Sequence, residues 1–309
     1  MNKGQEILYK QSLDVNIDRL LAQRRLYSNA KIKQYILIAI TFIIPILIAF
    51  VAIFFNLKID DTNWVYTIYA VAAIFGEKIL EIFIDRNKKT AASIQEKFDT
   101  NVFDIPENKL LNSVFIDHDI VRKYSKRDKR NLKKVSKVTN WYSTKIDCLQ
   151  TNIAILFCQR MNICYDQNIK KKYNILLILL SVITFAILLI VSLINDFSLK
   201  IFLLKVILPS IPILNFTYKE INQNRESVDN LQILREKIEA KLNSLSRNHT
   251  IEVSELRNIQ DRIFNNRTLS PLIPDLIYKL LWTELEDEMN YSVVNRIHEL
   301  QMNVDEDYC

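Results

Sequence analysis

Two uncharged apolar runs constrain this chain more than any other feature of its sequence. Residues 36–55 (ILIAITFIIPILIAFVAIFF) and 175–194 (ILLILLSVITFAILLIVSLI) contain no charged side chain. A helix of either run reaches across the roughly 30 Å hydrocarbon core of a bilayer. After a short link, each run is followed by a second apolar stretch that carries a few charges. The pattern therefore predicts a membrane protein built on two helical hairpins.

Glycine is nearly absent from the 309 residues, with only Gly4 and Gly76. The nucleotide-binding turns G-x-G-x-x-G and G-x-x-x-x-G-K-[ST] need several glycines and are excluded. Barrels and sandwiches also use glycine in turns and bulges, so the scarcity argues against them. We expect an all-α membrane protein, with four transmembrane helices as two hairpins and a helical cytoplasmic domain.

Cysteines and histidines follow no metal-binding spacing. The sequence has no C-x-x-C pair and no H-E-x-x-H motif, so we expect no zinc site and no cofactor. It also lacks a G-x-S-x-G motif and a recognisable pair of catalytic carboxylates, so we do not expect an enzyme. The first apolar run follows 35 mostly polar residues and is too long for the apolar core of a signal peptide. We expect it to be a permanent anchor.

The distribution of cations predicts the orientation in the membrane. The expected spans are 34–55, 63–84, 174–195 and 197–218. Segments 1–33, 85–173 and 219–309 contain seven, nineteen and eleven Lys and Arg residues, whereas the two hairpin tips contain one and none. Cytoplasmic loops carry the excess of cations. Both termini and the long middle segment are therefore expected in the cytoplasm.

The chain divides into five predicted segments. They are a cytoplasmic N-terminal helix at 1–33, hairpin 1 at 34–84, a basic helical segment at 85–173, hairpin 2 at 174–218, and an acidic helical tail at 219–309. We expect helices at 88–103, 108–137, 141–173, 253–264 and 275–302, and a heptad-like apolar seam after span four. The middle segment has nineteen cations and ten acids, and the tail has eleven cations and seventeen acids. Opposite charge favours packing of these two segments on each other.

A basic run at 122–137 holds nine cations and one acid. It has two interpretations: a helix that faces solvent or anionic lipid headgroups, or a phosphate-binding face. Trp141 and Tyr142, with Lys145, supply rings on which bases could stack, or form a packing anchor. Under the ligand hypothesis, the candidate residues for binding a cyclic nucleotide are Arg122, Lys126, Arg127, Arg130, Trp141, Tyr142, Lys145 and Arg160.

Charges and prolines within the spans are candidates for pore or gating roles. The set is Pro45, Glu77, Lys78, Glu81, Lys205, Pro209 and Pro212. Intramembrane charges usually face a bundle interior or a water path, and the alternative is that they snorkel to the headgroups. Lys205 lies deeper than Lys200 and is the better pore-lining candidate. Proline kinks a helix, which suits a gate, but it is also common in ordinary membrane helices.

Several short segments together resemble a known family. They are 21–31 (LAQRRLYSNAK), 94–100 (IQEKFDT) with Val102 and Phe103, 140–142 (NWY), 158–162 (CQRMN) with Asp166, and 270–275 (SPLIPD) with Tyr278. In this order, and with the spans between them, they are similar to the SMODS-associated four-transmembrane effectors. The chain departs from that pattern at Asp104, Glu107, Tyr165 and Lys170.

The resemblance implies an antiphage effector of a CBASS or Panoptes-like system. A nucleotidyltransferase partner would make a cyclic oligonucleotide that either triggers the membrane protein or holds it silent. Opening of a homo-oligomer would permeabilise the bacterial inner (plasma) membrane in abortive infection, with no DNA or RNA partner and no catalytic residue. The alternative is a non-conducting membrane scaffold that recruits a cytoplasmic partner through its helical tail.

Overall fold

The computed structural model describes residues 3–45, 47–48, 51, 59–112, 114–245 and 251–303. Every regular element in these ranges is a helix, which confirms the all-α prediction. Of the tip of hairpin 1 expected at 56–62, residues 56–58 lie outside the described residues, and residues 59–62 already belong to α4 (Ile59–Phe103).

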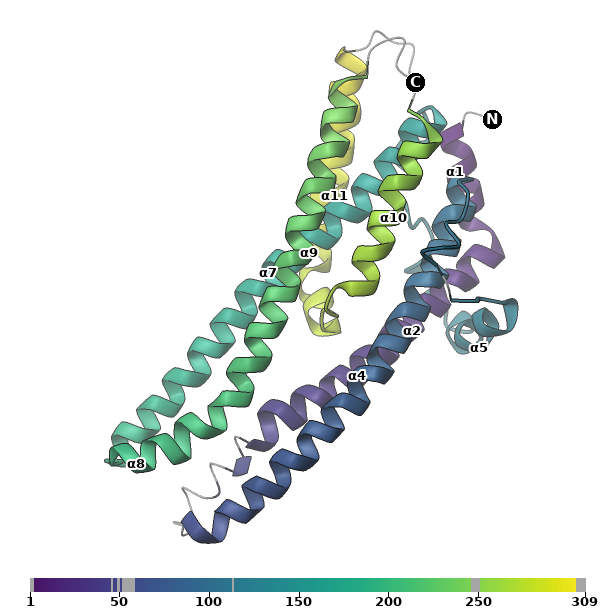
Figure 1. The fold of residues 1–309 in the computed structure, drawn as a ribbon. Coiled ribbons are helices and arrows are strands. Elements are labelled where there is room, and N and C mark those ends of the chain that lie inside the picture. Colours follow the sequence, from purple (N-terminus) through teal and green to yellow (C-terminus); the bar gives the residue numbers. More distant parts are fainter. Residues whose placement is uncertain are drawn as a thin grey trace.

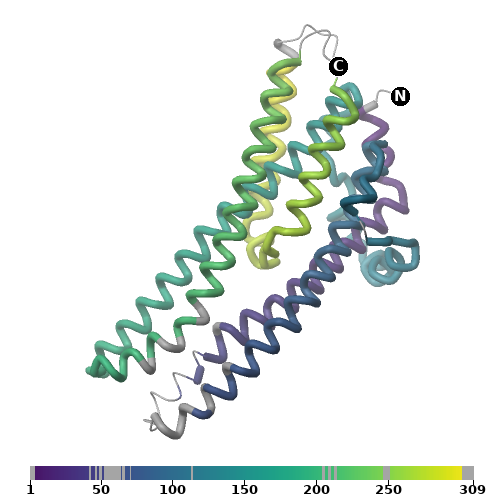
Figure 2. The backbone as a smooth tube through the Cα atoms, viewed as in Figure 1, coloured from purple at the N-terminus to yellow at the C-terminus, as the bar shows by residue number. Residues whose placement is uncertain are grey.

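Two long helical hairpins form the frame of the molecule. In hairpin 1, α2 (Asp14–Ile38) continues into the π-helical turn η1 (Ala39–Ile43) and pairs with α4 (Ile59–Phe103). In hairpin 2, α7 (Thr151–Ile194) pairs with α9 (Leu208–Asn243) through the short α8 (Leu199–Phe202) and η3 (Leu203–Ile207). The turn η1 and the start of α4 lie at the same end of the molecule as α8, whereas the start of α1 and the end of α11 lie at the opposite end (Figures 1 and 2).

Proline explains where the hairpins depart from regular α-helix. Each of the two π-helical turns lies just before a proline, η1 before Pro45 and η3 before Pro209. Proline donates no hydrogen bond and its ring clashes with the carbonyl four residues earlier, so the preceding turn widens. Pro212 lies within the continuous α9 and has no such turn before it.

The apolar ends of the hairpins are not covered by protein. Among the described residues, α7 is the helix that is long and apolar enough to cross a membrane by length and composition, and only 6% of its apolar window is buried. The same end of α4 exposes Ile68, Phe75 and Ile82. Burying such side chains in solvent-free surroundings is favourable, so these surfaces require a nonaqueous environment or a partner.

The other helices build a head at the opposite end. Helix α1 (Lys3–Ser12) contacts α4 and α7, α10 (Val253–Leu269) lies between the two hairpins, and α11 (Asp275–Asn303) packs along α7 (Figure 1). The main core joins apolar side chains from all of these helices and from both hairpins. Most of the apolar seam predicted after span four is buried, namely Val228, Leu231, Ile238 and Leu242 of α9 and Leu245 just beyond it, whereas Ile221 is half-buried.

Two predicted helices of the middle segment are shorter than expected. The helix at 108–137 is instead an irregular segment at 104–117 followed by α5 (His118–Lys129) and α6 (Leu132–Ser136). The helix at 141–173 begins only at Thr151, after the 3-10 turn η2 (Thr144–Ile146). Asp104 and Asn140 each adopt a φ of 56° before these irregular segments. Asp and Asn tolerate this left-handed conformation, which ends a helix.

Candidate functional site

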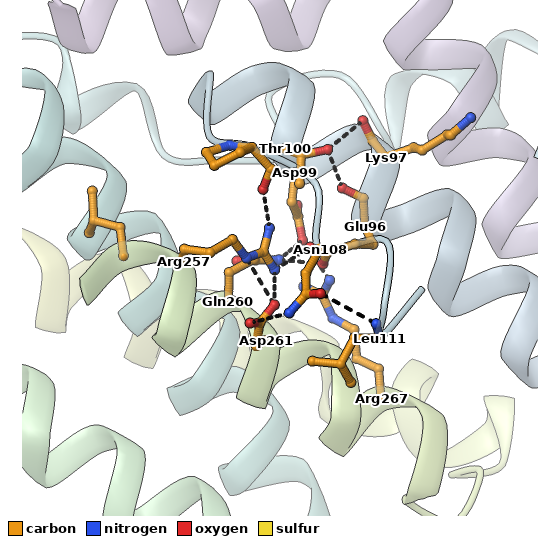
Figure 3. A network of polar contacts seen from close by, with 12 residues as sticks. Glu96, Lys97, Asp99, Thr100, Asn108, Leu111, Arg257, Gln260, Asp261 and Arg267 are labelled. Atoms are coloured by element: carbon orange, nitrogen blue, oxygen red, sulfur yellow. Dashed lines mark hydrogen bonds and ion pairs between the residues drawn. The ribbon is translucent and has the colours of Figure 1, made fainter. Parts of the chain in front are cut away.

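A buried polar network joins hairpin 1 to α10. Glu96 and Asp99 of α4 point toward Arg257, Gln260 and Arg267 of α10 (Figure 3). Arg267 contacts Asp99 at 2.5 Å, Arg257 contacts Glu96 at 2.6 Å, and Gln260 donates to both carboxylates. Asp99 is fully buried, so its three donors replace its hydration shell. This network fixes α10 against the C-terminal end of α4.

Tyr142 extends the network to hairpin 2. Its hydroxyl donates to Asp99 at 2.6 Å and accepts from Asn162 of α7 at 3.1 Å. The ring is 1% exposed and packs against Phe98 and Phe103, with centroids 6.1 and 5.3 Å away. Burial is the main cause that raises the pKa of Tyr142. The structure therefore places this candidate base-stacking residue inside the protein core.

The other aromatic and cationic candidates near Tyr142 in the sequence lie at the edge of the protein core. Trp141 is half-buried and meets Phe98 edge-on at 6.4 Å, while Lys145 is exposed. The structure thus brings the rings of Tyr142 and Trp141 together around Phe98.

The basic run lies on an outward face of α5 and α6. Arg122, Lys126, Arg127 and Arg130 are exposed, and no carboxylate pairs with them among the described residues. The one acid of the run, Asp128, is buried and forms an ion pair with Lys134 at 2.6 Å. Two pockets of the head are described below, and neither of them is lined by any of these four cations. The structure does not bring them together with Arg160.

A second buried polar network surrounds Lys170. Its ammonium group, 2% exposed, contacts Asp166 at 2.6 Å and the hydroxyls of Ser227 and Ser270 at 2.7 and 2.9 Å. Burial lowers the pKa of Lys170, and the neighbouring Asp166 opposes that shift. Asn266 donates to the same Asp166. This second network connects α7, α9 and the C-terminal end of α10.

Arg160, which the sequence pointed to, lines both pockets of the head. The larger pocket, of 370 Å³, lies between α7, α9 and α11, and its other lining residues are Glu239, Asn243, Tyr291, Ser292, Asn295, Arg296 and Glu299. Arg160 contacts Glu239 at 2.6 Å and donates to Ser292 at 3.0 Å. Arg296 contacts the other oxygen of Glu239 at 3.0 Å.

A smaller pocket of 250 Å³ lies on the other side of Arg160. Its polar lining includes Tyr165, Asn168, Arg235 and Glu288. Because the two pockets share Arg160 and Ser292, they form adjoining depressions along α7 and α11. Arginines, amides and tyrosines are the side chains that contact phosphates, base edges and base faces.

The gating candidates belong to the apolar half of the two hairpins by sequence position. Glu81 of α4 pairs with Lys78 at 2.9 Å and with Lys219 of α9 at 2.6 Å, and Glu77 is half-buried one turn earlier. Pro45 is buried beside η1. The side chains of Lys205, Pro209 and Pro212 lie outside the described residues. Glu81 and Lys219 thus form a contact between the two hairpins.

The tail supplies ion-pair partners that no sequence motif indicates. Glu239, Arg267 and Arg296 lie on amphipathic helices and follow no motif, so only their positions beside buried seams could have pointed to them. Packing of the tail on the middle segment is confirmed, but the pairing is mixed in sign. Acids of the middle segment bind arginines of α10, whereas Arg160 of the middle segment binds an acid of α9. No group of three potential metal ligands occurs in the described part of the chain.

The short sequence segments that resemble a known family contact one another in the folded head. Asp99, Tyr142 and Asn162 come from three of them, and Lys31 of the first contacts Asp275 of the last at 2.6 Å. No solved structure matches the chain. A probable CBASS effector molecule of Bacillus cereus (strain VD146) is 28% identical over 290 residues, which are 92% of this chain and 95% of that protein. Residues 5–295 match the SMODS-associating 4TM effector domain, and the chain belongs to that family.

Proposed function

We propose that this protein is an inner-membrane effector that permeabilises or depolarises the bacterial membrane under control of a cyclic oligonucleotide in antiphage defence. One observation carries the proposal. Both hairpins project uncovered apolar ends in the same direction from a polar, helical head. Such ends are suited to hydrocarbon, and such a head is suited to the cytoplasm.

In this proposal the four spans are 34–55, 63–84, 174–195 and 197–218, with both termini in the cytoplasm. The common direction of the two hairpin tips supports this topology, since both short turns then reach the outer face together. A homo-oligomer of these hairpins would form the structure that permeabilises the membrane. The π-helical turns before Pro45 and Pro209 are the places where the spans can bend.

Control by a nucleotide is supported by the family and by the name of the relative, a probable CBASS effector. A nucleotidyltransferase would supply the cyclic oligonucleotide. The helices α7 and α9 run from the head into the apolar region without a break, so a change of their angle in the head moves spans three and four. A ligand shifts this equilibrium only by its difference in affinity for the two arrangements.

The basic face of α5 and α6 has a separate role in this proposal, as a contact with anionic lipid headgroups. Arg122, Lys126, Arg127 and Arg130 are exposed and have no carboxylate partner within the described residues, and such cations contribute about 1 kcal/mol each near an anionic membrane surface. The exposed side chain of Leu132 lies among them.

A scaffold is the second candidate, and one surface favours it. Helix α11 exposes Leu276, Leu280, Tyr291 and Val294, although its opposite face is packed on α7. These four residues recur at helical spacing and could dock a helix of a soluble partner.

Membrane potential in bacteria, followed with a voltage-sensitive dye after induced expression, separates the two candidates. Rapid depolarisation, either by this chain alone or only with a co-expressed cyclic-nucleotide synthase, supports the effector. An inserted protein that leaves the potential unchanged in both conditions and co-purifies with a stoichiometric soluble partner supports the scaffold.

A further inference from the structure

One carboxylate bridges two buried arginines in the larger pocket. Oε1 of Glu239 lies 2.6 Å from Nε of Arg160, and Oε2 lies 3.0 Å from Nε of Arg296. The arginine side chains are 6% and 13% exposed, whereas that of Glu239 is 26% exposed. The two cations come from α7 and α11, and the anion comes from α9. Arg296 also pairs with Glu299 of its own helix at 2.6 Å. Glu239 is therefore the carboxylate that joins the three helices, and it is more accessible than either arginine.

The two oxygens of this carboxylate have the geometry of a phosphodiester. A phosphodiester also offers two anionic oxygens to guanidinium groups, and arginine binds both kinds of anion through the same N–H donors. An arginine that is nine-tenths buried cannot be solvated freely, so some anion must accompany it. For Arg160 that anion is Glu239, whereas Arg296 shares Glu239 with Glu299, which lies 2.6 Å from its Nη1.

The rest of the pocket suits a nucleoside more than a simple ion. Tyr291 is exposed at the rim and offers a ring face, and Asn243 and Asn295 offer amides that can bind base edges. Arg296 already donates to the Asn243 side chain, so the amide is held in place.

We propose that this pocket binds a nucleotide phosphodiester through Arg160 and Arg296, and that Glu239 occupies the phosphate position until the ligand displaces it. That the ligand is a cyclic oligonucleotide rests on the function proposed above. Glu239 is then an internal competitor that sets the ligand concentration at which the protein responds.

Displacement has a consequence for the hairpin. Glu239 is the contact through which α9 holds the arginines of α7 and α11, so its release loosens α9 from both helices. The displaced carboxylate finds a new cation at Arg235, four residues earlier on the same helix and on the wall of the adjoining pocket. Because α9 continues into span four, the signal passes along that helix.

The test uses the full chain in lipid nanodiscs, with inorganic pyrophosphate and cyclic di-AMP as separate probes. Glu239→Gln removes the competing charge and keeps the shape of the side chain. We expect this variant to bind both probes about tenfold more tightly than the wild type, and Arg160→Met to lose binding to a similar extent. Glu236→Gln is the matched control, because it removes an exposed charge one turn earlier on α9 and should bind like the wild type.

Loss of the carboxylate leaves the buried Arg160 without its anion, whereas Arg296 keeps Glu299 at 2.6 Å, so Glu239→Gln is expected to melt at a lower temperature. A second measurement therefore accompanies the affinities. Pyrophosphate should raise the melting temperature of Glu239→Gln more than that of the wild type. In the wild type, hydrogen exchange should change around 235–243 and 289–299 when either probe is added.

Equal or weaker binding by Glu239→Gln, or protection confined to α5 and α6, overturns the inference. If neither the wild type nor Glu239→Gln binds pyrophosphate or cyclic di-AMP, the inference is overturned as well. The effector function is judged separately by depolarisation, which these outcomes do not decide. A depolarising protein with no probe binding in this pocket would therefore retain the proposed function and lose the inferred site.

Discussion

Glu81 of α4 and Lys219 of α9 form an ion pair of 2.6 Å that joins the two hairpins next to the predicted inner boundary of the membrane. Lys78 contacts the other oxygen of the same carboxylate at 2.9 Å. Most polar contacts between the hairpins lie in the head and pass through α10. This pair acts directly between two helices that enter the apolar region, so it restrains the spans themselves.

Removing that restraint should make the protein depolarise membranes more readily. Partly exposed pairs contribute about 1 kcal/mol, so Glu81→Gln should shift the equilibrium between hairpin arrangements by roughly fivefold. The measurement is the inducer concentration at which a voltage-sensitive dye reports depolarisation. The charge-exchanged double variant, Glu81→Lys with Lys219→Glu, should restore the wild-type threshold. A threshold unchanged in Glu81→Gln would show that the pair does not restrain the spans.

Tyr142→Phe should destabilise the head. The change leaves Asn162 without its acceptor and removes one donor from the buried Asp99, which costs about 1–3 kcal/mol when a buried partner is left unsatisfied. Thermal unfolding of the full chain in detergent measures the effect. Tyr9→Phe removes an exposed hydroxyl at the surface of α1 and should leave the melting temperature nearly unchanged. Equal melting temperatures for both variants would contradict the role assigned to Tyr142.

The ion pair between Asp99 and Arg267 should show strong coupling in a double-mutant cycle. Either Asp99→Asn or Arg267→Met alone leaves one charge buried, which typically costs about 3–5 kcal/mol. The double variant removes both charges and should be less destabilised than the sum of the two single changes. Melting temperatures or denaturant midpoints of the four proteins measure this coupling. Additive effects would show that the two side chains act independently.

Periodicity in the sequence predicted the helical architecture because apolar runs and seams are local properties of the chain. The buried seam of α9 and the two hairpins follow directly from such patterns. The segment 104–150 was not predictable in this way. Asp104 and Asn140 adopt left-handed backbone conformations, and Tyr142 is buried through contacts with residues far away in the sequence, in α1, α4 and α7. Arg160 was identified from its motif, but its partner Glu239 lies 79 residues away. The basic run stood out most in the sequence and yet lines neither pocket of the head.

Reversing the charge of Arg127 and Arg130 separates the two interpretations of the basic run. Both side chains are exposed and without a carboxylate partner in the described part of the chain, so Arg127→Glu with Arg130→Glu should keep the wild-type melting temperature. We expect the double variant to bind cyclic di-AMP like the wild type and to lose a salt-sensitive contact with anionic lipid. The contact is measured as hydrogen exchange of α5 in nanodiscs with and without anionic lipid. Loss of nucleotide binding would instead return the ligand site to α5.

Glu220 should make the stability of the protein depend on pH. It lies on α9 just beyond span four, where burial is the largest cause that raises its pKa from 4.5 to about 7. Tyr173 donates to its carboxylate at 3.3 Å and Gln34 at 3.4 Å, and Lys88 and Lys219 oppose the shift by their charge. Between these two pKa values the folded protein keeps a proton that the unfolded chain has released. The free energy of unfolding therefore falls as pH rises through this window.

One pKa unit corresponds to about 1.4 kcal/mol, so the loss across the window is roughly 3 kcal/mol. Glu220→Gln has no proton to release and should lose this dependence, so that it melts above the wild type at pH 8 and approaches it at pH 4.5. Glu226→Gln, which alters an exposed acid on the same helix, should keep the wild-type slope. Melting temperatures of the three proteins in detergent at half-unit pH intervals provide the comparison. Parallel curves for wild type and Glu220→Gln would show that Glu220 is ionised throughout this range.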